Sequence, residues 1–178
     1  MKTLTAIDVM VPLKEYPHAL ATDTLRDAAR MLVEAQIRVS EGKRSMPRVV
    51  LVFDDEHKLL GAARRRDILK GLEPDRLEEL DEITDVHIKS EADPDLAEVL
   101  SPDDSAHWRQ RFETPVGEVV REIVARVEAT DSLTKIIYEF VSNDSHMAVV
   151  VDADEVVGVV RTVDVLRRVY EAITVATP

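Results

Sequence analysis

The sequence GAARRRD at residues 61–67 has a counterpart in GVVRTVD at residues 158–164. Both begin with a Gly and two apolar residues, continue with an Arg, and place an Asp three residues after that Arg. A further match joins ATDTL at residues 21–25 to ATDSL at residues 129–133. The chain therefore contains two copies of one unit. The copies cover residues 19–72 and 127–170.

The first copy carries an insertion around Ile37 to Pro47, of the size that surface connections tolerate. A further similarity upstream, between DVM at residues 8–10 and EVV at residues 118–120, extends both units. Each unit then has about 65 residues, which is longer than the roughly 20 to 50 residues of a solenoid repeat. Duplication of a small domain is the expected organisation.

Each unit begins with an amphipathic helix. Apolar side chains recur at helical spacing in both copies, and this spacing predicts helices with one buried face. They are Leu25, Ala28, Ala29 and Leu32 in the first copy, and Leu133, Ile136, Ile137, Phe140 and Val141 in the second. Asp23 or Thr24, and Asp131 or Ser132, can accept hydrogen bonds from the free amides of the first helical turn. These residues mark where the helices begin.

An apolar hairpin follows in each copy. The continuous apolar runs at residues 49–53 and 148–151 favour strands that are buried on both faces. In each copy the return strand leads into a second helix. Asp67 and Asp164 therefore lie in a first helical turn, where a carboxylate can cap backbone amides. Each copy is predicted to fold as helix, strand, strand, helix.

Composition limits the classes of function. The net charge is −12, and residues 73–104 hold 13 acidic residues against 2 basic ones. Because nucleic-acid binding needs a basic face, we expect no nucleic-acid partner. Cys is absent, which excludes disulfides and thiolate metal sites. No apolar run approaches the ~20 residues that cross a bilayer. We expect a cytoplasmic protein with no membrane or metal partner.

The segment between the copies is too long for a simple loop, so we expect it to contain helix. Its acidic run is interpreted as a solvated connector, and a docking site for a basic partner is the alternative. Trp108 and Phe112 are four residues apart, which lets both face one side of a helix that packs on the module or on a second subunit. The predicted divisions are residues 1–72 for the first domain, 73–114 for the connector and 115–178 for the second domain.

These features together resemble the cystathionine-β-synthase (CBS) domain. The resemblance rests on a capped amphipathic helix, a strand of the Val-Val-Asp type, and a hairpin ending in Gly, two apolar residues, a polar residue, two variable residues and Asp. It implies an α/β (α+β) fold in which two CBS-type β-α-β-β-α units pack sheet to sheet as a pseudo-two-fold pair. It also implies two clefts between the copies and a homodimeric assembly.

In that family the clefts commonly bind adenine nucleotides or related adenosyl ligands, and the Asp of the motif accepts hydrogen bonds from the ribose hydroxyls. The resemblance thus implies that Asp67 and Asp164 contact the ribose of AMP, ADP, ATP or S-adenosylmethionine, with no obligatory cofactor. A carboxylate is an acceptor only and can take both vicinal hydroxyl protons. Helix capping alone is the alternative role.

The chain departs from the family pattern at Arg64 and Arg161, where Ser or Thr is usual. Each Arg can hold a phosphate through paired hydrogen bonds, or it can pair with a carboxylate of the acidic connector or with Asp67 and Asp164.

Arg48 and His146 stand just before the first strand of each hairpin. The resemblance implies that the His position faces phosphate, and a surface residue is the alternative. The insertion adds Lys43 and Arg44 beside Arg48. These cations can form a lip for a polyphosphate or belong to a solvated loop.

We expect no catalytic site. The chain has no nucleotide-binding Gly-rich turn, no nucleophile elbow and no Cys, and its His residues lack metal-ligand spacing. The predicted function is that of a stand-alone regulatory module that binds an adenosyl ligand and signals to an effector protein in trans. The alternative is a ligand-free scaffold for dimerisation or interaction, whose substituted motifs no longer bind nucleotide.

Overall fold

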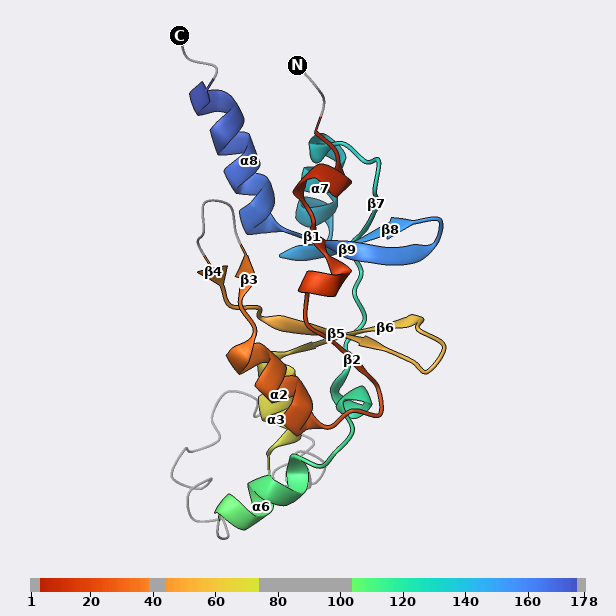
Figure 1. Cartoon of the computed structure of the whole chain (residues 1–178), viewed down its shortest axis with the longest axis vertical. Helices are drawn as coiled ribbons and strands as arrows, with labels where there is room; N and C mark the ends of the chain where they lie inside the picture. The colour runs from red at the N-terminus through yellow and green to blue at the C-terminus, as the bar shows by residue number, and fades with distance from the viewer. Residues whose placement is uncertain (1–3, 39–43, 74–103, 176–178) are drawn as a thin grey trace, which may run out of the picture.

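The computed structural model describes residues 4–38, 44–73 and 104–175, and it contains two facing β-sheets with helices on their outer sides (Figure 1). The first copy supplies β2 (His18–Leu20), α2 (Leu25–Glu34), β5 (Val49–Phe53), β6 (Leu59–Arg64) and α3 (Arg65–Gly71). The second copy supplies β7 (Arg126–Glu128), α7 (Leu133–Ser142), β8 (Met147–Asp152), β9 (Glu155–Arg161) and α8 (Thr162–Val175). The predicted pair of β-α-β-β-α units packed sheet to sheet is confirmed.

Both sheets are built alike. In the first, β2 pairs in parallel with β5, and β5 pairs antiparallel with β6; β7, β8 and β9 repeat this pattern. Alternate side chains of a strand point to opposite faces. Val52 therefore packs into the core beneath the helices of its own copy, whereas Leu51 packs between the two sheets. In the second copy, Val150 packs into the core beneath the helices and Val149 packs between the two sheets. The prediction of strands buried on both faces is therefore confirmed.

The first helix of each copy begins where its cap predicts. The Thr24 hydroxyl accepts a hydrogen bond from the Asp27 amide at 3.1 Å. The Ser132 hydroxyl accepts one from the Lys135 amide at 3.4 Å. Of the two candidates in each copy, the hydroxyl residue is therefore the cap.

The predicted apolar face is confirmed for α2 and corrected for α7. In α7 only Ile136 and Phe140 are buried, and Leu133 packs against the same core; Ile137 and Val141 are exposed. The reason is the helical period, because residues 136 and 140 share one stripe while residues 137 and 141 fall on the next. An apolar side chain at helical spacing was thus not sufficient to predict burial.

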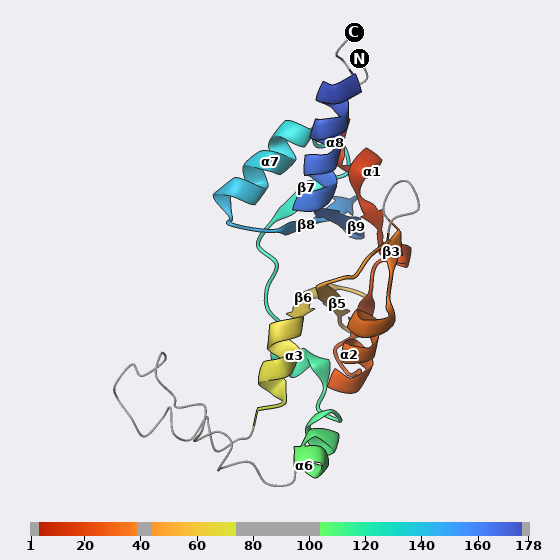
Figure 2. The same ribbon diagram turned by 90° about the vertical axis from the view of Figure 1, so that its left-hand side faces the viewer.

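The segments that lead into the two copies are exchanged between them. Although α1 (Ala6–Val9) and β1 (Val11–Pro12) precede the first copy, β1 pairs with β9 and α1 packs into the core of the second. Conversely, η3 (Val116–Val119) precedes the second copy, but Val116 is buried in the core of the first. Figure 2 shows α1 beside α8. The predicted domain boundaries after residues 72 and 114 describe the order of the segments along the chain. As boundaries between domains they stay a prediction.

The glycine of the repeated motif makes room for this exchange. A Cβ atom on Gly61 would lie 2.3 Å from the carbonyl oxygen of Arg121, and one on Gly158 would lie 2.6 Å from that of Val11. A side chain at either position would push the lead segment of the other copy off the sheet. Gly61 and Gly158 are therefore part of the contact between the copies.

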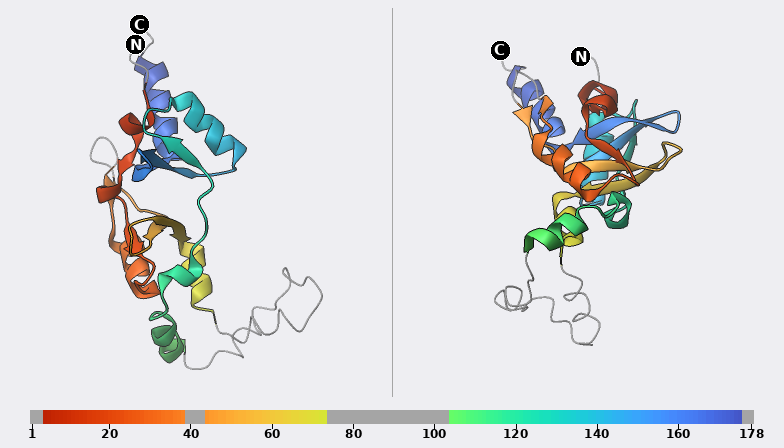
Figure 3. Two further views of the ribbon diagram at one scale, coloured as in Figure 1. Left: turned by 90° about the vertical axis from the view of Figure 1, so that its right-hand side faces the viewer. Right: turned by 60° about the horizontal axis from the view of Figure 1, so that its bottom comes forward.

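The insertion and the connector contain more structure than loops. In the insertion, β3 (Ile37–Arg38) pairs with β4 (Arg44–Ser45), and Ile37 is buried between the sheets, so its described residues are more ordered than the solvated loop that was one of the two alternatives. Lys43 and the acidic residues 74–103 lie outside the described residues. The connector ends in a helix, as expected: α6 (Asp104–Arg111) lies at the opposite end of the molecule from α8 (Figure 3). Phe112 packs on the first copy, whereas Trp108 is exposed.

Candidate functional site

Two Arg–Asp pairs occupy equivalent positions, where each hairpin meets its second helix. Strand β6 ends at Arg64 and strand β9 ends at Arg161. The Asp three residues later lies in the first turn of α3 or α8, and both Asp67 and Asp164 are buried. The predicted place of these two carboxylates is therefore confirmed.

In the first copy, Arg64 surrounds the carboxylate of Asp67. Its backbone amide and Nε both donate to Oδ2, at 3.0 and 2.8 Å, and its Nη2 donates to Oδ1 at 3.1 Å. Arg121 Nε lies 3.8 Å from Oδ1. Burial alone would raise the pKa of Asp67, but hydrogen bonds from Arg64 and the charges of Arg64 and Arg121 outweigh it, so that the pKa is lowered. The Arg64 side chain is 59% exposed and that of Asp67 only 7%, so the guanidinium lies at the surface whereas the carboxylate is buried.

In the second copy, the same pair is enclosed. Arg161 Nε donates to Asp164 Oδ2 at 2.6 Å and its Nη2 donates to Oδ1 at 2.8 Å. The side chains are only 12% and 11% exposed. Tyr16, which is 4% exposed, lies near enough to sense both charges. Burial raises the pKa of Tyr16 to about 12, with Arg161 opposing the increase and Asp164 adding to it.

The exchanged lead segments beside the two pairs differ as well. Val11 pairs with Val159 in the second copy, and Arg121 pairs with Ala62 in the first. From Val11 the chain takes seven positions to reach β2, and it forms the 3₁₀ turn η1 (Leu13–Glu15) on the way, directly before Tyr16. From Arg121 it takes only five positions to reach β7, and Val124, the last residue but one before β7, is 69% exposed. The longer segment places the buried ring of Tyr16 near the Arg161–Asp164 pair, and the shorter segment has no aromatic counterpart to it.

A surface cleft of about 330 Å³ lies beside Asp67, between α3 and the chain that follows α6. This volume is at the lower end of the roughly 300–1,000 Å³ typical of small-molecule sites. Among the described residues that line it, Lys70, Arg111 and Arg121 carry positive charge, and Asp67 and Glu118 are acidic. Because Asp67 is already paired with Arg64, the described part of the lining is cationic in a protein whose net charge is −12.

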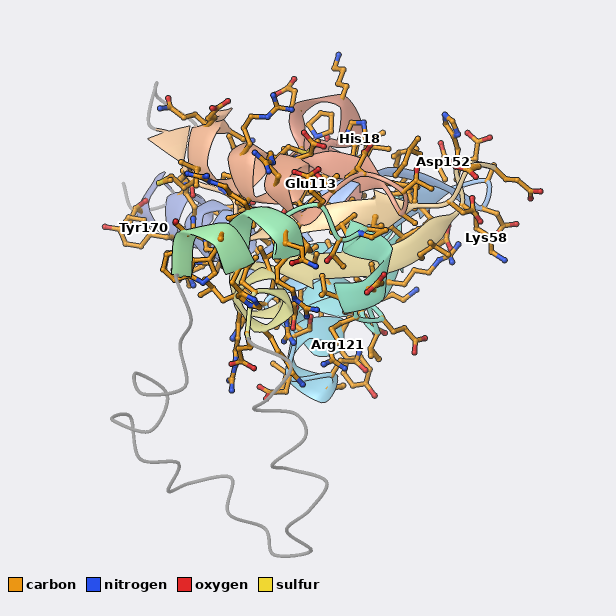
Figure 4. The ribbon with its side chains drawn as sticks, turned by 90° about the horizontal axis from the view of Figure 1, so that it is seen from below. His18, Lys58, Glu113, Arg121, Asp152 and Tyr170 are labelled. Atoms are coloured by element: carbon orange, nitrogen blue, oxygen red, sulfur yellow. The ribbon has the colours of Figure 1, made fainter. Side chains whose placement is uncertain are left out.

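Figure 4 shows Arg121 on the side of the molecule where α3 lies, apart from Tyr170 of α8. Arg121 reaches the cleft from the segment that joins the two copies, so a molecule bound there would touch both α3 and that joining segment. The Nε of Arg111 donates to the Gly71 carbonyl oxygen at 2.9 Å, which ties α6 to the end of α3. The ring of His107 lies 3.3 Å from the Leu72 carbonyl oxygen and adds a second tie.

Arg48 and His146 are placed beside the Arg–Asp pairs but expose their side chains. The Arg48 carbonyl oxygen accepts a hydrogen bond from the Arg65 amide at 3.3 Å, and the His146 carbonyl oxygen accepts one from the Thr162 amide at 3.0 Å. These backbone contacts join each hairpin to its second helix. Neither residue lines the cleft at Asp67. A phosphate role for their side chains stays a prediction.

Sequence reasoning did not select Tyr16 or Arg121 as site residues. A signal for Arg121 was present, because it directly follows EVV at residues 118–120 and so corresponds to Val11. No comparable signal marked Tyr16, because the second copy has no aromatic residue in the corresponding segment.

Within residues 4–38, 44–73 and 104–175, no group of three or more His, Asp or Glu side chains is arranged to hold a metal ion. Among the helices of that same part of the chain, none has the length and apolar character that crossing a membrane requires.

The fold and the paired motifs define a tandem α/β module with one Arg–Asp pair in each repeat. The family model of the CBS domain matches residues 6–74 and 116–171, so both repeats and more than half of the chain are covered. The chain belongs to the CBS-domain family. A comparison with curated proteins finds no significant match.

Solved structures of CBS-domain proteins share the fold. A CBS domain-containing protein from Kribbella flavida superposes with a TM-score of 0.70 at 13% identity, over 94% of this chain and 99% of that one. The CBS domain of a membrane protein from Sphaerobacter thermophilus gives 0.63 at 21% identity, over 93% and 88%. CBSX2 in complex with AMP gives 0.61 at 18% identity, over 95% and 98%.

Proposed function

We propose that the chain is a regulatory module that binds an adenine nucleotide or a related adenosyl ligand and signals to an effector protein in trans. The observation that carries this proposal is the cleft at Asp67, which has the size of a small-molecule site and is lined by α3 and by the segment joining the two repeats. A ligand bound there would contact both elements and bias their relative position. Regulation of a partner needs a coupling energy of about 1 to 3 kcal/mol between the two binding events.

The similarity to CBSX2, whose structure holds AMP, supports an adenine nucleotide as the ligand class. Asp67 suits a ribose because its carboxylate can accept hydrogen bonds from two adjacent hydroxyls. Asp164 occupies the equivalent position in the second repeat. The exposed side chain of Arg64 can turn from Asp67 to a phosphate when the ribose takes its place. A role in regulation rather than catalysis is part of this proposal.

The test is the melting temperature of the purified chain with AMP, ADP, ATP and S-adenosylmethionine. A ligand at 100 times its dissociation constant stabilises the native state by about 2.7 kcal/mol, which raises the melting temperature by several degrees. The Asp67→Ala variant should lose most of this shift. If none of the four compounds changes the melting temperature at millimolar concentration, the ligand-binding proposal is wrong.

The second candidate function is a ligand-free scaffold, and one observation favours it. In both repeats the carboxylate that would meet a ribose is already bonded to an Arg of the same motif. A scaffold predicts no thermal shift with any nucleotide. It also predicts that Asp67→Ala costs only the stability of a helix cap, about 1 kcal/mol.

We propose that the module forms a homodimer through α8. Val165 and Val169 pack this helix on its own core, but Leu166, Tyr170 and Ile173 form a second apolar stripe at 4- and 3-residue spacing that is 63–70% exposed. Tyr170 points away from the molecule in Figure 4. Such a stripe is complementary to itself when two copies meet across a two-fold axis. The Leu166→Glu variant should sediment as a monomer, whereas a dimeric variant would exclude this surface.

A further inference from the structure

We propose that the chain binds one ligand per polypeptide, at the Asp67 cleft alone, and that this ligand is an anionic nucleotide whose phosphate is held by Arg121. This inference rests on the proposed function above and narrows it in two ways. It selects one of the two equivalent motifs, and it selects phosphate-bearing adenosyl compounds over cationic ones.

The charge of the cleft selects the ligand. Asp67 and Arg64 carry opposite charges and form an ion pair, so together they add no net charge to the cleft, and this sum is the same when Arg64 turns from the carboxylate to a phosphate. Among the described lining residues, Lys70 and Arg121 then outnumber Glu118. A phosphate relieves this excess of positive charge, whereas the sulfonium and ammonium groups of S-adenosylmethionine add to it. We therefore expect AMP and ATP to bind and S-adenosylmethionine to be rejected.

Arg121 is the residue placed to make the phosphate contact. Its side chain is 61% exposed, and its distance of 3.8 Å from Asp67 leaves its guanidinium only loosely held by that carboxylate. A guanidinium presents parallel donors that match two phosphate oxygens. Its backbone is fixed against β6 by the bridge to Ala62, so the side chain starts from a rigid position.

The second motif has neither an exposed Arg in its Arg–Asp pair nor a positive charge at the position equivalent to Arg121. Both Asp67 and Asp164 are buried and ion-paired, but the side chain of Arg161 is 12% exposed whereas that of Arg64 is 59% exposed, so a ribose that replaces Arg161 would have to move a buried guanidinium. The position equivalent to Arg121 is Val11, which carries no charge and is itself buried. The Asp164 motif therefore joins β9 to α8 as a structural element and takes no nucleotide.

The experiment is isothermal titration calorimetry of the full chain with ATP, AMP, adenosine and S-adenosylmethionine, at low and high salt. We expect a stoichiometry of one, tighter binding of ATP than of adenosine by at least tenfold, and weaker ATP binding at high salt. Arg121→Val, which installs the residue found at the equivalent position of the other repeat, should weaken ATP at least tenfold and leave adenosine unchanged. Arg126→Val is the matched control, because it removes one exposed positive charge away from the cleft.

The outcomes distinguish a failure of the proposed function from a failure of the narrower proposal of a single anionic site. Absence of binding by every adenosyl compound overturns the proposed function itself. Binding of two nucleotides per chain, equal affinity for S-adenosylmethionine and ATP, or wild-type ATP affinity in Arg121→Val overturns the single anionic site and leaves the proposed function in place. Equal thermal stability of Arg121→Val and wild type, measured in the absence of ligand, ensures that lost affinity reports on the contact.

Discussion

The two Arg-x-x-Asp motifs have the same spacing and the same ion pair with a buried Asp, but the Arg of one lies at the surface and the Arg of the other is enclosed. The Arg64 side chain is 59% exposed and the Arg161 side chain is 12% exposed. The lead segments beside the two motifs differ as well, because the one that carries Tyr16 is two positions longer than the one that carries Arg121. A repeated motif can therefore place a pair of side chains without determining whether a ligand can reach them.

The largest expected effect comes from breaking the enclosed pair. Asp164→Ala leaves the Arg161 guanidinium buried without a counter-ion, which costs about 3–5 kcal/mol of unfolding free energy. Asp67→Ala costs about 1 kcal/mol, because Arg64 can turn into water and mainly a cap is lost. Urea unfolding of the two variants measures both values.

A second substitution controls for the loss of contacts other than the ion pair. Asp164→Ala combined with Arg161→Met should recover most of the loss, since no unpaired charge then remains. Equal costs of Asp164→Ala and Asp67→Ala would show that the two pairs are equivalent in energy in spite of their different exposure.

The next largest effect is a loss of folding stability at alkaline pH, which we expect from Tyr16 beside the second motif and from no equivalent residue beside the first. Because burial raises the pKa of Tyr16 to about 12, its proton is lost more readily in the unfolded chain than in the folded one. Its contribution is complete below about pH 10 and decreases as the pH rises toward 12, by at most about 2.7 kcal/mol. Tyr16→Phe should lose less stability than wild type between about pH 9 and pH 11.5, measured by urea unfolding. Parallel losses in both proteins would exclude Tyr16 as the cause.

The smallest effect is an acid-side loss that belongs to the first motif. The pKa of Asp67 is lowered, so its ionised form is favoured in the folded chain. The stability it contributes, about 1 kcal/mol on the scale of a helix cap, is present above its ordinary pKa and lost as the pH falls through the lowered one. Asp67→Asn should be less stable than wild type at neutral pH and should approach it in acid. A constant difference across the acid range would contradict this assignment.

Periodicity and local chemistry predicted most of the fold. Leu25, Ala28 and Leu32 lie on one helical stripe, and the runs at residues 49–53 and 148–151 favour strands buried on both faces, which is what they form. These signals are local, so the sequence carries them directly. The position of Asp67 and Asp164 in a first helical turn followed from the same local signals.

The tertiary features could not be predicted in this way. The exchange of the lead segments depends on β1, which has two residues, and on single bridges such as that between Ala62 and Arg121, which are too short to carry a pattern. The buried Tyr16, which interacts electrostatically with Arg161 and Asp164, is nearly 150 positions away from Asp164 in the chain. The preference of Arg64 for Asp67 over the other carboxylates was one of the alternatives that only the structure could decide between.

The exchanged lead segments also bear on how a single repeat would behave. A polypeptide with one repeat and its own lead segment would have nowhere in itself to place that segment, and it would need a second chain to supply the missing sheet edge and core residues. The duplicated protein contains both donors in one polypeptide. Its internal pairing is therefore independent of protein concentration, unlike that of two separate chains, and dilution cannot take the two halves of the module apart.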